Sequence, residues 1–147
     1  MSMNQSLHTR LLRTAFLVGA VTDALALIPL LFPPAARLLW GFEDFSGPYQ
    51  FATGYAASLM LGWTALLVWA YRRPLERAFV AALTVIVIYG LIVTEAVAVV
   101  SGHLAVSRMI PTWCLQAALL GLFATAYHYP LVETWFAAER ALEPPGA

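Results

Sequence analysis

Two carboxylic acids, Asp23 and Glu95, interrupt stretches of sequence that are otherwise almost wholly apolar. Burial disfavours the charged form of a carboxylic acid, so a neutral acid in an apolar pocket can donate a proton or a hydrogen bond. Two such groups in different surroundings can divide the roles of general acid and general base. An ionised acid beside aromatic rings would instead bind an amphiphilic amine by ion pairing and cation–π contact. Asp23 and Glu95 are therefore the candidate catalytic residues.

The composition of the chain indicates a membrane protein. Of its 147 residues 61% are hydrophobic and 11% are charged, whereas soluble domains carry about 25% charged residues. The formal net charge is zero, and the eight basic residues are all arginines spread over loops and chain ends, which argues against a nucleic-acid partner. The single cysteine, Cys114, excludes an internal disulfide and an oxidoreductase that needs paired cysteines.

Four apolar stretches are long enough to cross a bilayer as helices, which takes about 20 residues. They cover residues 14–32, 51–71, 79–100 and 106–127. The fourth helix is expected to begin at Val106 with a kink at Pro111, or at Pro111 itself. The sequence thus predicts an all-α fold, an integral membrane four-helix bundle over residues 14–129. Residues 1–13 form an N-terminal segment, and an amphipathic tail with a disordered end is predicted for residues 130–147.

The distribution of arginines predicts the orientation in the membrane. Four spans place six arginines on the side of the chain termini and two, Arg37 and Arg108, on the other side. Basic residues concentrate on the cytoplasmic side of membrane proteins, so both termini are predicted to be cytoplasmic, with the bundle in the inner (plasma) membrane. The absence of lysine beside abundant alanine, leucine and arginine is consistent with a bacterial source that has a GC-rich genome.

Polar residues within the spans are predicted to gather in the outer half of the bundle, away from the termini. At a rise of 1.5 Å per residue, Asp23 lies about 13 Å, Glu95 about 7 Å and Tyr55 about 6 Å from the outer end. Gln116 falls near the depth of Asp23, and Arg108 falls near the membrane surface. We therefore expect an acidic pocket that opens toward the outer side. The ligand-binding residues expected around the two acids are Tyr55, Trp63, Trp113, Gln116 and Arg108.

Structural explanations compete with this interpretation. Glu95 can pair with Arg108 one loop away, or it can serve the same site as Asp23. Asp23 has no basic residue at its depth, so it is protonated, bonded to Gln116 or a hydroxyl, or held for ligand or proton chemistry. The aromatic candidates can equally be packing or interfacial residues.

Small residues recur every four positions on three of the predicted helices. Such stripes let helices approach closely, either within the bundle or at the interface of a dimer. Because Asp23 continues the stripe of the first helix, it should point into the bundle. The stripes are Ala15 and Gly19; Gly54, Ser58 and Gly62; and Ala117, Gly121 and Thr125.

In layout the chain resembles the small four-span bundles of the DoxX-like and sterol-isomerase/sigma-2 (EXPERA) groups. The resemblance covers the transmembrane part and rests on the topology and on Asp23 and Glu95. It implies cytoplasmic termini and, for the second group, a pocket within the bundle lined by acidic residues. The sterol-isomerase group also uses His and Asn within its spans, where this chain has neither, so no catalytic assignment is carried over.

Three functions fit these observations. The first is a protein that binds a lipophilic or amphiphilic small molecule; if it is an enzyme, it is an acid–base isomerase, cyclase or epoxide-opening enzyme. The second is an accessory subunit of a larger membrane complex. The third is a proton-coupled transporter of small cations that uses Asp23 as its carrier site, against which the arginine bias and the apolar inner half argue.

Partners and cofactors follow from the same pattern. A lipophilic small molecule and membrane lipid are the expected partners, with a homodimer or a membrane-complex partner left open and no nucleic acid. No cofactor is expected. No metal is expected either, because His8, His103 and His128 fall on different sides of the membrane.

Overall fold

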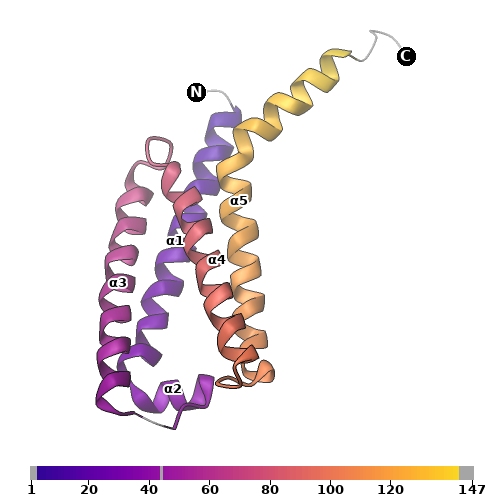
Figure 1. Cartoon of the computed structure of the whole chain (residues 1–147). Coiled ribbons are helices and arrows are strands. Elements are labelled where there is room, and N and C mark those ends of the chain that lie inside the picture. The colour runs from indigo at the N-terminus through magenta and orange to yellow at the C-terminus, as the bar shows by residue number, and fades with distance from the viewer. Residues whose placement is uncertain (1–2, 44, 143–147) are drawn as a thin grey trace.

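Four long helices run side by side in the computed structural model, and one short helix lies across an end of the bundle (Figure 1). The structure describes residues 3–43 and 45–142, with side chains for 5–43 and 45–129. We call the end with the short helix the α2 end, and the opposite end, near the N-terminus and the α3–α4 loop, the terminus end. The helices are α1 (Met3–Leu31), α2 (Pro33–Trp40), α3 (Gly47–Arg72), α4 (Phe79–Val100) and α5 (Val106–Leu142).

All four long helices are long and apolar enough to cross a membrane. Large aliphatic side chains such as Leu17, Val21 and Ile86 are exposed on the outer faces of the bundle, an arrangement that suits hydrocarbon as the surrounding solvent. The chain is therefore a multi-pass membrane protein, and the predicted all-α four-helix bundle is confirmed. The spans are Gln5–Leu31, Gly47–Arg72, Phe79–Val100 and Val106–Tyr129.

Two helices begin earlier than their predicted membrane spans. α1 begins at Met3 rather than near residue 14, and α3 begins at Gly47 rather than near residue 51. An apolar run marks only the part of a helix that hydrocarbon surrounds, and the helix can continue into the interface wherever its residues permit. Pro48 at the start of α3 favours the earlier boundary, because proline is well tolerated in the first turn.

α5 is much longer than the fourth predicted span. It begins at Val106, so Pro111 lies within its second turn, and it continues past residue 127 to Leu142. Residues 130–142, predicted as part of a tail, are therefore helical, and these last turns lean away from the bundle (Figure 1). The predicted disordered end at residues 143–147 lies outside the described residues.

The bundle consists of two helix pairs. α1 packs along α3 and α4 packs along α5, with further contacts between α1 and α5, whereas α3 and α4 touch each other at few positions. The tightest packing lies toward the terminus end, where all four helices contribute fully buried apolar side chains. These are Leu12, Ala15, Phe16, Leu67, Ala70, Val80, Ala81, Phe123 and Ala126.

One of the three small-residue stripes packs inside the bundle. At Gly19 a Cβ atom would lie 2.7 Å from Cζ of Phe123 and 3.2 Å from Cδ1 of Leu67, so only glycine fits there without a shift. At Gly62 of α3 and Gly121 of α5 a Cβ atom would meet nothing within 4 Å. Close approach within the bundle therefore explains the stripe of α1 and leaves the stripes of α3 and α5 facing outward.

A proline creates a contact between α1 and α5. Ring atom Nε2 of His8 donates a hydrogen bond to the carbonyl oxygen of Ala126 at 3.0 Å. Within a helix this carbonyl would accept from the residue four positions later, but that residue is Pro130, which has no N–H. The carbonyl oxygen that lacks a helical donor thus accepts a hydrogen bond from the neighbouring helix, and the contact joins the two helices at the terminus end.

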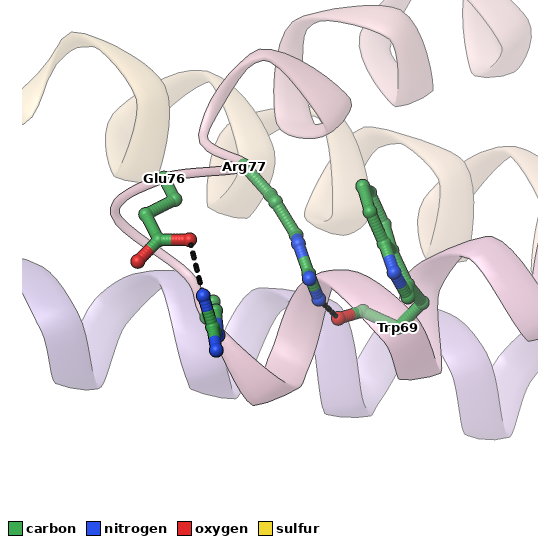
Figure 2. Close-up of polar contacts among 4 residues, drawn as sticks. Trp69, Glu76 and Arg77 are labelled. Atoms are coloured by element: carbon green, nitrogen blue, oxygen red, sulfur yellow. Dashed lines mark hydrogen bonds and ion pairs between the residues drawn. The ribbon is translucent and has the colours of Figure 1, made fainter.

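Arg77 closes the C-terminal end of α3 (Figure 2). Its guanidinium lies 3.5 Å above the ring centroid of Trp69, and Nη1 donates to the main-chain oxygen of the same residue. This oxygen belongs to the last turn of α3, where carbonyls lack helical partners. In contrast, the nearby ion pair of Arg73 with Glu76, at 3.3 Å, joins two side chains that are about two-thirds exposed.

These two arginines should differ in their contribution to stability. Arg77→Ala is expected to lower the free energy of unfolding by about 1–2 kcal/mol, because it removes a cation–π contact and a charged hydrogen bond. Arg73→Ala should lower it by less than about 0.5 kcal/mol, since exposed ion pairs contribute little. Unfolding of both variants in mixed micelles with increasing SDS measures the difference, and equal losses would contradict the role assigned to Arg77.

Candidate functional site

A cavity of about 400 Å³ lies between the two helix pairs, midway along the bundle; we call it the lateral pocket. Its exposed lining residues Leu59, Val87 and Leu91 belong to α3 and α4, so the pocket opens where these two helices diverge. This mouth faces sideways, toward the surface that hydrocarbon would cover. The remaining lining residues are Gly19, Asp23, Ala56, Met60, Trp63, Leu67, Thr84, Ile88, Leu119 and Phe123.

Asp23 is the one ionisable group among the residues that line the lateral pocket. Within the described part of the chain its carboxyl group has neither an ion pair nor a hydrogen bond. Trp63 adds an indole Nε1 atom that is buried without a hydrogen-bond partner. The hydroxyl of Thr84 already donates to the carbonyl oxygen of Val80 at 2.8 Å. The wall therefore presents one carboxyl group against an apolar background, and the unpaired N–H of Trp63 is buried beside it.

The lateral pocket is closed toward the terminus end. Leu67 and Phe123 form its last wall on that side, and both are fully buried in the core described above. Phe16 packs against Phe123, with their ring centroids 6.2 Å apart. These fully buried, packed side chains lie between the polar groups of the pocket and the terminus end of the bundle.

Glu95 lies in a polar contact between α4 and α5. Nε2 of Gln116 donates to Oε1 of Glu95 at 2.9 Å, and Trp113 lies against the same carboxyl group. We call these three residues the Glu95 cluster. Gln116 is only 6% exposed, yet its Oε1 has no hydrogen-bond partner, and the same holds for the buried atoms Oε2 of Glu95 and Nε1 of Trp113. Trp113 and Glu95 lie against each other, so the group in the cluster that remains without a partner of either kind is the buried amide oxygen of Gln116.

The Glu95 cluster continues the wall of the lateral pocket toward the α2 end. Glu95 follows the lining residue Leu91 by four positions on α4, and Gln116 precedes the lining residue Leu119 by three positions on α5. Residues three or four apart share a helix face, so both side chains lie one turn beyond the pocket on its own stripes. Glu95 itself does not line the pocket that holds Asp23.

The other predicted ligand-binding residues are distributed differently. Tyr55 is 64% exposed and does not line the lateral pocket, although Trp63, eight positions later on α3, does. Nη1 of Arg108 donates to the carbonyl oxygen of Leu38 at 2.7 Å, and Glu95 accepts from Gln116. The alternative pairing of Arg108 with Glu95 is therefore not formed in the structure. Gln116 likewise bonds to Glu95 rather than to Asp23.

Arg108 lines a second cavity, of about 680 Å³, which we call the α2 pocket. This cavity lies at the α2 end, and it shares no lining residue with the lateral pocket. The predicted pocket is therefore divided into two separate cavities and the polar cluster of Glu95. The α2 pocket is lined by Thr22, Leu25, Ala26, Pro29, Leu38, Leu39, Trp40, Ser107, Arg108, Pro111, Thr112 and Leu115.

Sequence reasoning missed most of the lateral pocket. Met60, Ile88, Leu119 and Phe123 line it, but apolar residues occupy nearly every position of these helices and carry no signal of their own. Gly19 was noted for close packing, and its place in the pocket wall is new. Within residues 5–43 and 45–129, no three His, Cys, Asp or Glu side chains gather as a metal site would require.

Comparisons of this chain with models of protein families, with curated proteins and with solved structures found no match.

Proposed function

We propose that this protein binds a lipophilic or amphiphilic small molecule in the lateral pocket. The observation that carries the proposal is Asp23, a carboxyl group in the wall of an otherwise apolar cavity of about 400 Å³. Pockets for small molecules typically measure about 300–1,000 Å³ and combine an apolar lining with a few polar groups that fix orientation. A charge-bearing group in hydrocarbon is costly, so its place beside a cavity favours use by a ligand.

The mouth between α3 and α4 supports entry from the bilayer. A lipophilic molecule dissolved among the lipid chains reaches Leu59, Val87 and Leu91 without crossing water. Its apolar body would lie against the walls of the pocket, including the ring of Trp63, while its polar group would meet Asp23. The Glu95 cluster lies one turn farther toward the α2 end, where it would receive a second polar group of a longer ligand.

The same arrangement supports acid–base chemistry on the bound molecule. Asp23 faces the cavity, whereas Glu95 shares its carboxyl group with Gln116, so the two acids have different surroundings. Such a difference allows one carboxyl group to give a proton while another accepts one. An isomerase, cyclase or epoxide-opening reaction fits this equipment, with Asp23 as the residue that exchanges a proton with the substrate.

The sealed core argues against the transporter alternative. A proton-coupled transporter needs its carrier residue to reach water on both sides of the membrane in turn. Leu67, Phe123 and Phe16 are fully buried between Asp23 and the terminus end.

The arginines in the loops and chain ends support an orientation in which the terminus end of a bacterial inner-membrane protein lies in the cytoplasm.

Native mass spectrometry of detergent-released protein tests the proposal with a matched pair of variants. Ala56 lines the lateral pocket, and Ala65, nine positions later, lies on the opposite face of α3 and is exposed. A co-purifying small molecule should be retained by wild type and Ala65→Phe and lost from Ala56→Phe. Asp23→Asn should reduce its occupancy by about 10-fold or more, as expected when a hydrogen bond to a charged group is lost.

Two results would contradict the proposed function. Equal occupancy in Ala56→Phe and Ala65→Phe would remove the ligand from the lateral pocket. A wild-type protein that carries no small molecule but retains a protein partner would favour the accessory subunit, for which the outward-facing Gly62 and Gly121 leave room for contact.

A further inference from the structure

The α2 pocket is separate from the lateral pocket and has a different polarity. Its apolar wall is formed by Leu25, Ala26, Pro29 and Leu115 from α1 and α5, of which Leu25 and Leu115 are exposed. At its outer rim stand Arg108, in the first turn of α5, and Trp40, the last residue of α2. From Arg108 to Leu115 the wall extends about 10 Å along α5, so the cavity combines a cationic rim with an apolar groove.

Arg108 is held in place by the end of α2. Its Nη1 donates at 2.7 Å to the carbonyl oxygen of Leu38, which lies in the last turn of α2 where carbonyls lack helical partners. α2 ends at Trp40, and the next residue, Gly41, has a φ of 78°, which glycine readily adopts. A Cβ atom at Gly41 would lie 3.8 Å from the guanidinium carbon of Arg108. The end of α2 therefore fixes the position of the guanidinium group of Arg108.

The positive charge of Arg108 is not neutralised by the described residues around it. A guanidinium group carries five N–H donors, and the contact with Leu38 uses one of them. Within residues 5–43 and 45–129 the one ion pair joins Arg73 and Glu76, at the opposite end of the bundle. Arg108 thus presents several donors and a full charge to whatever occupies the rim of the α2 pocket.

We propose that the α2 pocket is a specific site for one anionic phospholipid. The lipid phosphate would accept hydrogen bonds from Arg108, whose planar fork suits phosphate oxygens, and one acyl chain would lie in the groove along Leu25 and Leu115. Trp40 stands at the rim, where tryptophan is favoured beside headgroups. An apolar groove beneath a cation matches a membrane lipid better than a free anion, because a free anion leaves the groove unfilled.

Arg37 provides a matched control at the same end of the bundle. It is exposed on α2 and lies 5.5 Å from the ring centroid of Phe45, outside the α2 pocket. A lipid attracted by charge alone would depend on both arginines, whereas a lipid held in the pocket depends on Arg108. The two variants Arg108→Gln and Arg37→Gln therefore separate a built site from general attraction.

The test measures binding of phosphatidylglycerol and of phosphatidylcholine with identical acyl chains by native mass spectrometry of the purified full-length protein. Wild type and Arg37→Gln should bind one phosphatidylglycerol at least 10-fold more tightly than phosphatidylcholine, and Arg108→Gln should lose this preference. Excess inorganic phosphate should not displace the lipid. If Arg108→Gln fails to fold, Leu115→Trp, which fills the groove and leaves Arg108 intact, should weaken phosphatidylglycerol binding to the same extent.

Three results would overturn the phospholipid site. They are equal binding of the two lipids by wild type, an unchanged preference in folded Arg108→Gln or Leu115→Trp, and displacement of the lipid by inorganic phosphate, which would indicate a free-anion site. None of these results bears on the lateral pocket, because Arg108 and Leu115 do not line it.

Discussion

Gly19→Val is expected to lower the free energy of unfolding by about 2 kcal/mol in the wild-type background, because α1 packs closely against α5 at this position. When Phe123 is alanine, the same substitution should lower the free energy of unfolding by much less. In wild type the new side chain meets the fully buried Phe123 ring, since even its first carbon would lie 2.7 Å from Cζ. Phe123→Ala alone should cost about 3 kcal/mol, and the space it leaves accepts the valine. The double-mutant cycle should show a coupling of about 2 kcal/mol.

The control for this cycle is Gly62→Val, because a Cβ atom at Gly62 meets nothing within 4 Å. Gly62→Val should change stability by less than about 0.5 kcal/mol and should show no coupling with Phe123→Ala. SDS titration in mixed micelles, followed by circular dichroism, gives all the required free energies. Additive losses for Gly19→Val and Phe123→Ala would mean that the two residues do not share one packing site.

Gln116→Leu is expected to destabilise the bundle by about 2–3 kcal/mol, because it leaves the carboxyl group of Glu95 buried without its amide donor. In the double variant Glu95→Leu with Gln116→Leu, both polar groups are gone, and stability should return to the wild-type value or exceed it. Replacing both partners of a buried polar pair by apolar residues is often neutral or stabilising, whereas removing one partner is not.

The same pair of variants separates stability from function. If the Glu95 cluster receives part of the ligand, the double variant should be stable yet hold the co-purifying molecule at about 10-fold lower occupancy, as for loss of one charged hydrogen bond. A polar residue kept at a cost in stability is the pattern of a functional site. Two results would give Glu95 a purely structural role. One is a double variant that is less stable than Gln116→Leu alone, and the other is a double variant that binds the molecule as wild type does.

The sequence was sufficient to predict the fold because hydrocarbon imposes a minimum length and polarity on any spanning helix. Four apolar runs correspond to four long helices. The predicted ends failed at α1 and α5, since Arg10, Arg13 and the residues after Tyr129 are compatible with a helix outside the bilayer. Span length reports the thickness of hydrocarbon and says little about where the helix stops.

The site was predicted in part, and the failures have a geometric cause. Positions eight residues apart on an α-helix are separated by eight steps of about 100°, which leaves a rotation of about 80° between them. Tyr55 and Trp63 are eight apart and point differently, as do Arg108 and Gln116. Asp23 was placed correctly inside the bundle by its shorter spacing from Gly19. The packing between pairs of helices decides which neighbouring helix each stripe faces. The sequence alone gives no measure of this packing.

The sideways mouth of the lateral pocket changes the reference state against which its affinity is defined. A ligand that enters between α3 and α4 has already left water, and each methylene group has gained about 0.8 kcal/mol on partitioning into the bilayer. The apolar walls add little to that transfer, so selectivity over the surrounding lipid rests on Asp23, on Trp63 and on the fit of shape. A dissociation constant based on the ligand concentration in water would therefore follow the partition coefficient of the ligand. A dissociation constant based on the mole fraction of ligand in the membrane would instead measure the free energy of recognition by the protein itself.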